Sequence, residues 1–274
     1  MSKNVWSLHY MQNKPFVVEY PIRLNDISVD SKLRSWVAFD YLQDAAGKHA
    51  DLLGLGLQQL RNSDLSWVLS RIRLKMDDFP AYGDTLRITT YPSGFDRLFA
   101  YRQFVLSSAK SGRVFGVAGS AWLTLNTGNF RPVSPARHLT DLPQWQYDEA
   151  IYFQGETLGK ITAADIADDT PTMERVSCSM IDYNRHLNNA FYAMFTENYL
   201  GAKSSGLIRM KEIQLNFNQS TPLAEEIECR GIIQGNGAFY TAGFHRSSGK
   251  NAFQAQGIFE KIIPETDNKT AINS

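Results

Sequence analysis

Five side chains able to transfer protons or form hydrogen bonds lie within eight positions of the chain. They are Asp182, Asn184, His186, Asn188 and Asn189, in the run Ile-Asp-Tyr-Asn-Arg-His-Leu-Asn-Asn. In an extended backbone the first three project to the same side. Asn188 and Asn189 precede an apolar run and are good helix N-cap residues. The spacing therefore predicts polar groups gathered at a helix N-terminus, where backbone N–H groups can stabilise an oxyanion.

The helix that follows this motif is expected to cover 190–200 and to stop at Gly201, because glycine is a favoured C-terminal stop. A similar run occurs earlier, since 33–42 aligns with 187–196 and ends in Leu-Leu-Gly at 52–54. Both runs are apolar on most faces, which is typical of buried helices. The chain therefore contains an internal repeat.

Strands are expected after each helix. The segments 70–76 and 212–218 both alternate polar with apolar residues, the pattern of a strand with one buried face. Each is followed by a proline-bearing turn and then by a predicted hairpin, over 99–125 in the first half and 239–262 in the second.

A helix that is apolar nearly all round needs a sheet curled about it. We therefore predict an α+β fold, a tandem (double) hotdog in which each long central helix is wrapped by an antiparallel β-sheet. The predicted organisation is an N-terminal hotdog over 1–131, a linker over 132–170 and a C-terminal hotdog over 171–274.

The two halves differ where the chemistry would occur. In the helix alignment, Ser28, Asp30 and Lys32 stand opposite the Asp, Asn and His of the motif. A set of residues needed only for helix capping would tolerate this replacement, whereas a catalytic set would not. We expect the second half to carry the catalytic motif and the first half to shape the cavity.

Composition narrows the functional classes. The 28 basic and 28 acidic residues balance, which argues against a general nucleic-acid binder because such proteins need surplus positive charge. No segment approaches the length of a membrane span. The first ten residues lack the apolar core of a signal peptide, so a cytoplasmic location is expected. Cys178 and Cys229 are expected to be free thiols, Cys178 a buried one. We expect neither a metal nor a cofactor, because the cysteines and histidines show no metal-site spacing.

Residues 182–189, Tyr192 and the strand over 213–221 are similar to those of the acyl-acyl-carrier-protein thioesterases of bacterial type, a double-hotdog family. The resemblance extends over nearly the whole chain and implies hydrolysis of fatty acyl thioesters carried by acyl carrier protein. It implies that Asp182, Asn184 and His186 are catalytic. In plant members a Glu-Cys pair joins the site, and its positions are Ser220 and Thr221 here, directly after Gln219. One of these three residues is expected to supply a fourth polar group, and we favour Ser220.

The same resemblance implies a mechanism and a set of binding residues. Water attacks a carbonyl held by the N–H groups near 188–190, and either Asp182 or His186 acts as the base. In the family the N-terminal hotdog sets the chain-length preference, which makes Trp36, Phe39, Trp67 and Leu69 candidates for lining the acyl cavity. Basic residues are expected to bind the acidic carrier, and the candidates are Arg185, Arg209 and Lys211. A monomer and a homodimer are both compatible with a fused double hotdog.

Three other functions remain open from the sequence. A hotdog hydratase or dehydratase also uses an Asp and a His, but in the pattern Asp-x-Asn-Pro-x-His, and no proline separates Asp182 from His186. A thioesterase for coenzyme A esters would use the same motif. A silent acyl-binding protein is the third alternative, because Ser220 stands where the family often has an acid.

Overall fold

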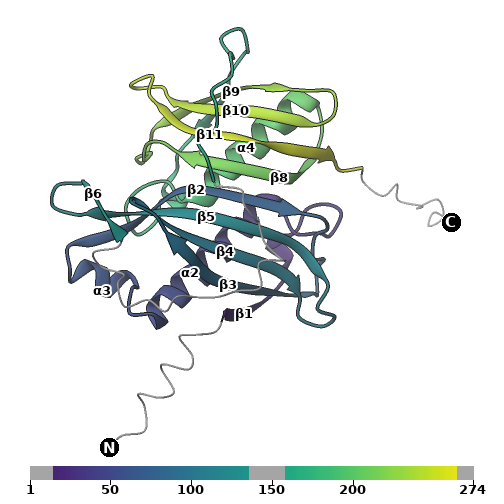
Figure 1. Ribbon diagram of the computed structural model, residues 1–274. Helices are drawn as coiled ribbons and strands as arrows, with labels where there is room; N and C mark the ends of the chain where they lie inside the picture. The colour runs from purple at the N-terminus through teal and green to yellow at the C-terminus, as the bar shows by residue number, and fades with distance from the viewer. Residues whose placement is uncertain (1–14, 136–157, 264–274) are drawn as a thin grey trace, which may run out of the picture.

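The computed structural model describes residues 15–135 and 158–263. It is an α+β structure in which one 11-stranded antiparallel sheet packs against two long helices (Figure 1). The helices are α2 (Ser35–Leu52), α3 (Leu57–Arg61) and α4 (Asn189–Ser204), with short 3-10 turns η1 (Leu24–Asp26) and η4 (Cys178–Met180). No helix in the described part is long and apolar enough to span a membrane.

The strands follow one another along the chain in two groups. They are β1 (Phe16–Pro21), β2 (Leu65–Met76), β3 (Thr85–Phe95), β4 (Phe99–Ser108), β5 (Val114–Asn126) and β6 (Pro132–Val133), then β7 (Thr172–Arg175), β8 (Ile208–Phe217), β9 (Glu226–Ile233), β10 (Ala238–His245) and β11 (Asn251–Lys261). The predicted hairpins are therefore present as β4–β5 and β10–β11.

The strand order repeats. From one edge of the sheet to its middle the first half reads β1-β3-β4-β5-β2. From the other edge to the middle the second half reads β7-β9-β10-β11-β8, which is the same order for the corresponding strands. The strands β2 and β8 therefore meet in the middle. This pairing runs from Arg71 opposite Asn216 to Lys75 opposite Glu212. Figure 1 shows α2 with the first group of strands and α4 with the second. The sheet is continuous through the junction, which fixes the two halves side by side.

Hydrogen bonds at the start of the two long helices confirm the aligned positions. Leu33 donates its N–H to the carbonyl of Pro80, and Leu187 donates to that of Thr221, each at 2.9 Å. Ile27 bridges to Leu33 as Ile181 bridges to Leu187. The repeat is thus one of backbone geometry as well as of apolar pattern.

The helix ends agree with prediction in one half only. The first helix ends at Leu52, and Gly54 takes the left-handed conformation at φ 72°. The expected stop at Gly201 is wrong, because α4 continues to Ser204 and Ser205 is the left-handed residue at φ 54°. A Cβ on Gly201 would lie 3.2 Å from the carbonyl oxygen of Gly206. This glycine allows the chain to fold closely over the helix instead of ending it.

The two helices meet at the N-terminus of α4. Gln43 of α2 accepts a hydrogen bond from the Asn189 side-chain amide at 3.0 Å and donates to Asn188 Oδ1 at 3.3 Å. One turn earlier, burial raises the pKa of Asp40 to about 6, against the lowering effects of Arg23 and of a hydrogen bond from Asn188. Polar groups of the first half thus hold the start of the second helix.

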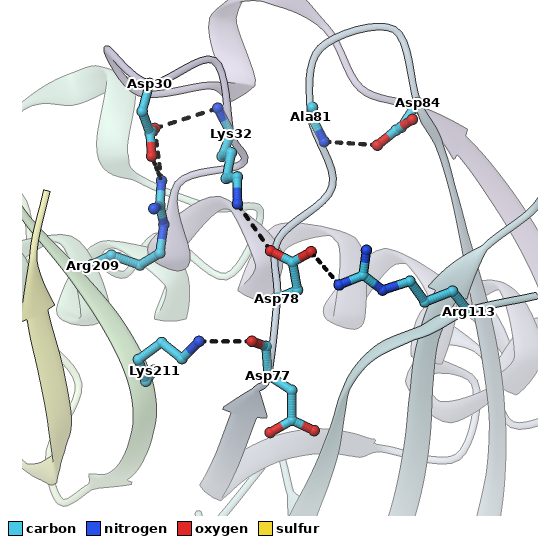
Figure 2. Close-up of polar contacts among 9 residues, drawn as sticks. All are labelled: Asp30, Lys32, Asp77, Asp78, Ala81, Asp84, Arg113, Arg209 and Lys211. Carbon is cyan, nitrogen blue, oxygen red and sulfur yellow. Dashed lines mark hydrogen bonds and ion pairs between the residues drawn. The ribbon is translucent and has the colours of Figure 1, made fainter. Parts of the chain in front are cut away.

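An ion-pair cluster also links the halves (Figure 2). Arg209 of β8 reaches Asp30 of the first half at 2.6 Å, and Lys211 Nζ donates to the carbonyl of Asp77 at 2.7 Å. Lys32 and Arg113 both pair with Asp78, at 3.0 and 2.6 Å. These contacts correct the expectation that Arg209 binds a carrier protein, because its side chain is only 7% exposed. Its guanidinium is committed to the interface between the halves.

We expect Arg209→Ala to lower the free energy of unfolding by about 3–5 kcal/mol, because it leaves Asp30 as a largely buried charge without its partner. Arg113→Ala is the matched control from the same cluster. Its side chain is 64% exposed, so its removal should cost about 1 kcal/mol or less. Urea denaturation of both variants measures the difference, and equal small losses would contradict the structural role of Arg209.

The raised pKa of Asp40 predicts a pH-dependent stability. Because the folded state holds this proton more tightly than the unfolded chain, the stabilisation from protonation is complete below about pH 4 and is lost as the pH rises through about 6. Asp40→Asn should therefore stabilise the protein by about 1–2 kcal/mol at about pH 8, with a gain that disappears near pH 4. Unfolding curves at the two pH values test this, and a gain independent of pH would refute it.

Candidate active site

The motif before α4 forms a tight turn. Asp182 donates its N–H to the carbonyl of His186 at 2.8 Å, and Arg185, at φ 65°, donates to the carbonyl of Asp182 at 3.0 Å. The backbone is therefore not extended as the alternating pattern suggested. Asp182, Asn184 and His186 nevertheless line the same cavity, because the turn brings both of its ends to one place.

The Asp182 carboxylate stabilises this turn. Its Oδ1 accepts hydrogen bonds from the backbone N–H groups of Asn184 at 2.8 Å and of His186 at 3.3 Å. The equivalent turn in the first half has the same backbone bond, from Ser28 N–H to the carbonyl of Lys32 at 2.8 Å. Asp182 thus fixes the backbone positions from which the side chains of Asn184 and His186 project.

Within the described residues, the hydrogen bonds at the start of α4 engage the backbone amides of Asn188 and Ala190 but not that of Asn189. Asn188 Oδ1 accepts from the N–H of Ala190 at 2.9 Å, which confirms Asn188 as the N-cap. The N–H of Asn188 donates to the carbonyl of Met180 at 2.9 Å. Among the three amides at 188–190, that of Asn189 is the one not engaged in these bonds. It lies at the positive end of the helix dipole.

A cavity of about 770 Å³ extends from the motif into the first half. At the motif end it is lined by Asp182, Asn184, His186, Asn189, Gln219 and Ser220. In the first half it is lined by residues of the C-terminal part of α2, of α3 and of the neighbouring strands, among them Ala46, Ala50, Leu60, Trp67, Leu69 and Trp122. Polar groups thus lie at one end and mainly apolar groups along the remainder.

The structure places the predicted binding residues differently. Trp67 lines the cavity, and its indole N–H donates to the carbonyl of Leu55 at 3.0 Å. Trp36 is not a lining residue and stacks on Phe191 with ring centroids 5.9 Å apart. Phe39 is 1% exposed and belongs to the core beneath α2. Asn188 is likewise absent from the lining because it caps the helix.

Of the three candidates for a fourth polar group, Thr221 is withdrawn from the cavity. Its hydroxyl accepts from the Tyr192 hydroxyl at 2.9 Å and lies 2.9 Å from His245 Nε2. Burial lowers the pKa of His245, which favours the neutral ring. Gln219 and Ser220 are exposed and line the cavity. Thr221 instead positions the turn, since its carbonyl holds Leu187.

Two residues that line the site were not assigned to it from the sequence. Gln43 lines the cavity and bonds to the N-terminus of α4, and Tyr192 lines it beside Thr221. No local signal distinguished Gln43, because Ser35 and His49 of the same helix are also polar and are more deeply buried.

The cysteines and possible metal ligands lie outside this arrangement. Cys178 is exposed, contrary to expectation, and Cys229 is buried, with a pKa raised by burial. Within residues 15–135 and 158–263, no group of three or more His, Cys, Asp or Glu side chains is placed to hold a metal ion.

Comparison with known proteins gives matches in both halves. Residues 13–141 match the acyl-ACP thioesterase N-terminal domain, and residues 164–261 match the C-terminal domain of the same family. A palmitoyl-acyl carrier protein thioesterase from Gossypium hirsutum is 25% identical over 192 residues, 65% of this chain. An oleoyl-acyl carrier protein thioesterase from Arabidopsis thaliana is 25% identical over 55% of the chain. In both alignments the chain spans 45% of the relative's length.

Solved structures share the fold. An acyl-ACP thioesterase from Bacteroides thetaiotaomicron superposes with a TM-score of 0.75 at 20% identity, over 91% of this chain and 99% of that one. A 12:0-ACP thioesterase from Umbellularia californica gives a TM-score of 0.77 at 16% identity, over 90% of this chain and 98% of that one. Because the two family domains together cover most of the sequence, the chain belongs to the acyl-ACP thioesterase family.

Proposed function

We propose that this protein hydrolyses fatty acyl thioesters of acyl carrier protein and releases the free fatty acid. The observation that carries the proposal is the position of His186, Asn184 and the first amide of α4 at the polar end of a cavity that is otherwise mainly apolar. A thioester carbonyl can lie at that end while the acyl chain occupies the remainder. Family membership supports the same reaction.

The substrate oxygen would be bound by the N–H of Asn189. The neighbouring amides of Asn188 and Ala190 are engaged with Met180 and with the N-cap side chain. A hydrogen-bond donor fixed at a helix N-terminus stabilises the negative charge that develops on the carbonyl oxygen during attack. We therefore narrow the predicted oxyanion site from three residues to one backbone donor.

His186 is assigned as the group that transfers protons. It takes a proton from the attacking water as the bond from oxygen to the carbonyl carbon forms. It returns that proton to the sulfur when the carbon–sulfur bond breaks, so that the products are a carboxylic acid and a thiol. Asp182 is assigned to positioning, because its carboxylate already holds the amides of Asn184 and His186. Asn184 and either Ser220 or Gln219 would orient the water.

The carrier is proposed to dock at the rim of the cavity beside the motif. Arg185 is exposed there, and Arg61 lies over the ring of Tyr183, which also lines the cavity, at 5.8 Å. Two positive charges at the rim suit an acidic partner. Lys211 does not line the cavity, and its ammonium group donates to the backbone carbonyl of Asp77 in the cluster that links the halves.

The hotdog organisation is part of the proposal. The repeated strand order and the one long helix in each half support two hotdog units, with boundaries at 1–131 and 171–274. Of the predicted linker, 132–133 form β6 against β5, and 136–157 lie outside the described residues. A cytoplasmic location and the choice between monomer and homodimer remain predictions.

Replacing the imidazole tests the reaction. We expect His186→Ala to lower the rate of thiol release about 10²–10⁴-fold, the usual contribution of a positioned acid–base group. Lys32→Ala is the matched control, because Lys32 occupies the equivalent position in the first half and its removal should leave the rate unchanged. The assay is thiol release from acyl carrier protein thioesters, with coenzyme A thioesters of the same acyl chains measured in parallel.

A His186→Ala variant that keeps the wild-type rate within a factor of two would eliminate the assignment. Faster turnover of the coenzyme A esters than of the carrier-protein esters would change the proposed substrate while keeping the reaction. Hydration of an enoyl thioester without thiol release would identify a hydratase.

A further inference from the structure

A cluster of buried polar side chains lies inside the first half, away from the groups assigned to catalysis. Arg102 of β4 is 9% exposed, His49 of α2 is 3% exposed, and Thr90 and Ser120 are fully buried. Charged and polar residues are seldom buried to this extent without a specific role. Arg102 also lines the cavity.

Hydrogen bonds join the cluster to the helix and to the sheet. Arg102 Nη1 lies 2.9 Å from His49 Nδ1 and donates to Thr90 Oγ1 at 3.3 Å. Because a guanidinium can only donate, His49 Nδ1 is the acceptor. Burial, with a smaller effect of Arg102, lowers the pKa of His49 to about 3, so this ring is neutral at working pH. The Trp122 indole N–H donates to Ser120 Oγ at 2.8 Å.

The register of the sheet places this cluster between the cavity and the core. Three rows of side chains on the helix-facing side of β2, β5 and β4 are, in order, Leu69–Trp122–Ala100, Ile72–Ser120–Arg102 and Leu74–Ala118–Phe104. All of the first row lines the cavity, only Arg102 of the second does, and none of the third does. The third row is at most 1% exposed. The second row is therefore the wall at which the cavity ends.

The composition of the wall determines what can pass it. An acyl chain lying along the first row is in contact with apolar side chains. To go further it would have to enter the space of the guanidinium and separate it from His49 and Thr90. Burying a charge without its hydrogen bonds is far more costly than burying further methylene groups is favourable. An apolar wall of the same size would lack this penalty.

We propose that the Arg102–His49–Thr90 cluster is the end-stop of the acyl cavity and limits the length of the acyl chain that the enzyme accepts. This proposal rests on the proposed function for the identity of the ligand as an acyl chain. It makes Arg102 a specificity-determining residue, although Arg102 is not near the reacting bond. The chain accepted by the native enzyme ends at the row formed by Leu69, Trp122 and Ala100.

The test is the chain-length profile of Arg102→Leu, measured as kcat/KM for saturated acyl carrier protein thioesters from eight to eighteen carbons. The ratio of kcat/KM for the chain two carbons longer than the native optimum to that for the optimum should rise roughly tenfold, because two more methylene groups become buried. A ratio within one enzyme preparation does not depend on the fraction that is folded.

Three further variants keep the result interpretable. Arg102→Gln retains a donor for His49 without the charge and should shift the profile in the same direction. It takes the place of the leucine variant if that variant does not fold. Arg102→Lys keeps the charge and should keep the native profile. Arg87→Leu is the matched control, because Arg87 belongs to the same sheet but pairs with Glu19 at 2.8 Å on the other face. An unchanged profile in both the leucine and the glutamine variants would overturn the end-stop.

A binding measurement separates this proposal from the proposed function. Trp67 and Trp122 line the cavity, so tryptophan fluorescence should respond to free fatty acids of increasing length. If the wild type hydrolyses no thioester, the proposed function fails. The end-stop still stands if Arg102→Leu or Arg102→Gln binds longer fatty acids than the wild type, and it fails if their length limit is the same.

Discussion

The site depends on one contact, the hydrogen bonds between Gln43 of the first helix and Asn188 and Asn189 at the start of the second. The second half carries the motif, whereas the first half contains most of the cavity. Neither half has both. The continuous sheet across β2 and β8 sets the distance between the two helices. The Gln43 side chain holds the N-terminus of α4 against α2. A carbonyl at the helix N-terminus and a chain along α2 can then belong to one ligand.

The two halves show how one backbone can serve two purposes. The turn before each helix has the same hydrogen bonds and a left-handed residue at the same position, Ser31 in one and Arg185 in the other. In the second half this turn presents His186 to the cavity. In the first half it presents Asp30 to Arg209 of the second half and Lys32 to Asp78 of the same half (Figure 2). The repeat thus assigns cohesion to one copy of the turn and, in our proposal, catalysis to the other.

The sequence predicted those features that depend on local pattern. Apolar periodicity located both helices, and alternation located the hairpins. The density of polar residues at 182–189 located the turn that lines the cavity. The features that the sequence did not predict depend on contacts between segments that are distant in the chain. Arg209 reads as a surface charge until β8 is placed against the first half. Trp36 and Phe39 lie on the helix that borders the cavity, yet they face other packing partners.

Gly201 illustrates the same limit. Glycine near the end of an apolar run usually ends a helix, but here the chain that follows folds back over it and needs the missing side chain. Gln43 was overlooked because its partners are about 145 residues away in the chain. The roles of Gly201 and Gln43 both depend on tertiary contacts, and no local sequence pattern predicts such contacts.

The most direct test of the account is the turnover number of Gln43→Leu with an acyl carrier protein thioester. Leucine has a similar size but cannot bond to Asn188 or Asn189. We expect the variant to fold, and kcat to fall by about 10-fold to 100-fold, because a small displacement of a catalytic group has effects of that order. A folded variant with an unchanged kcat would contradict the claim that this contact between the halves assembles the site.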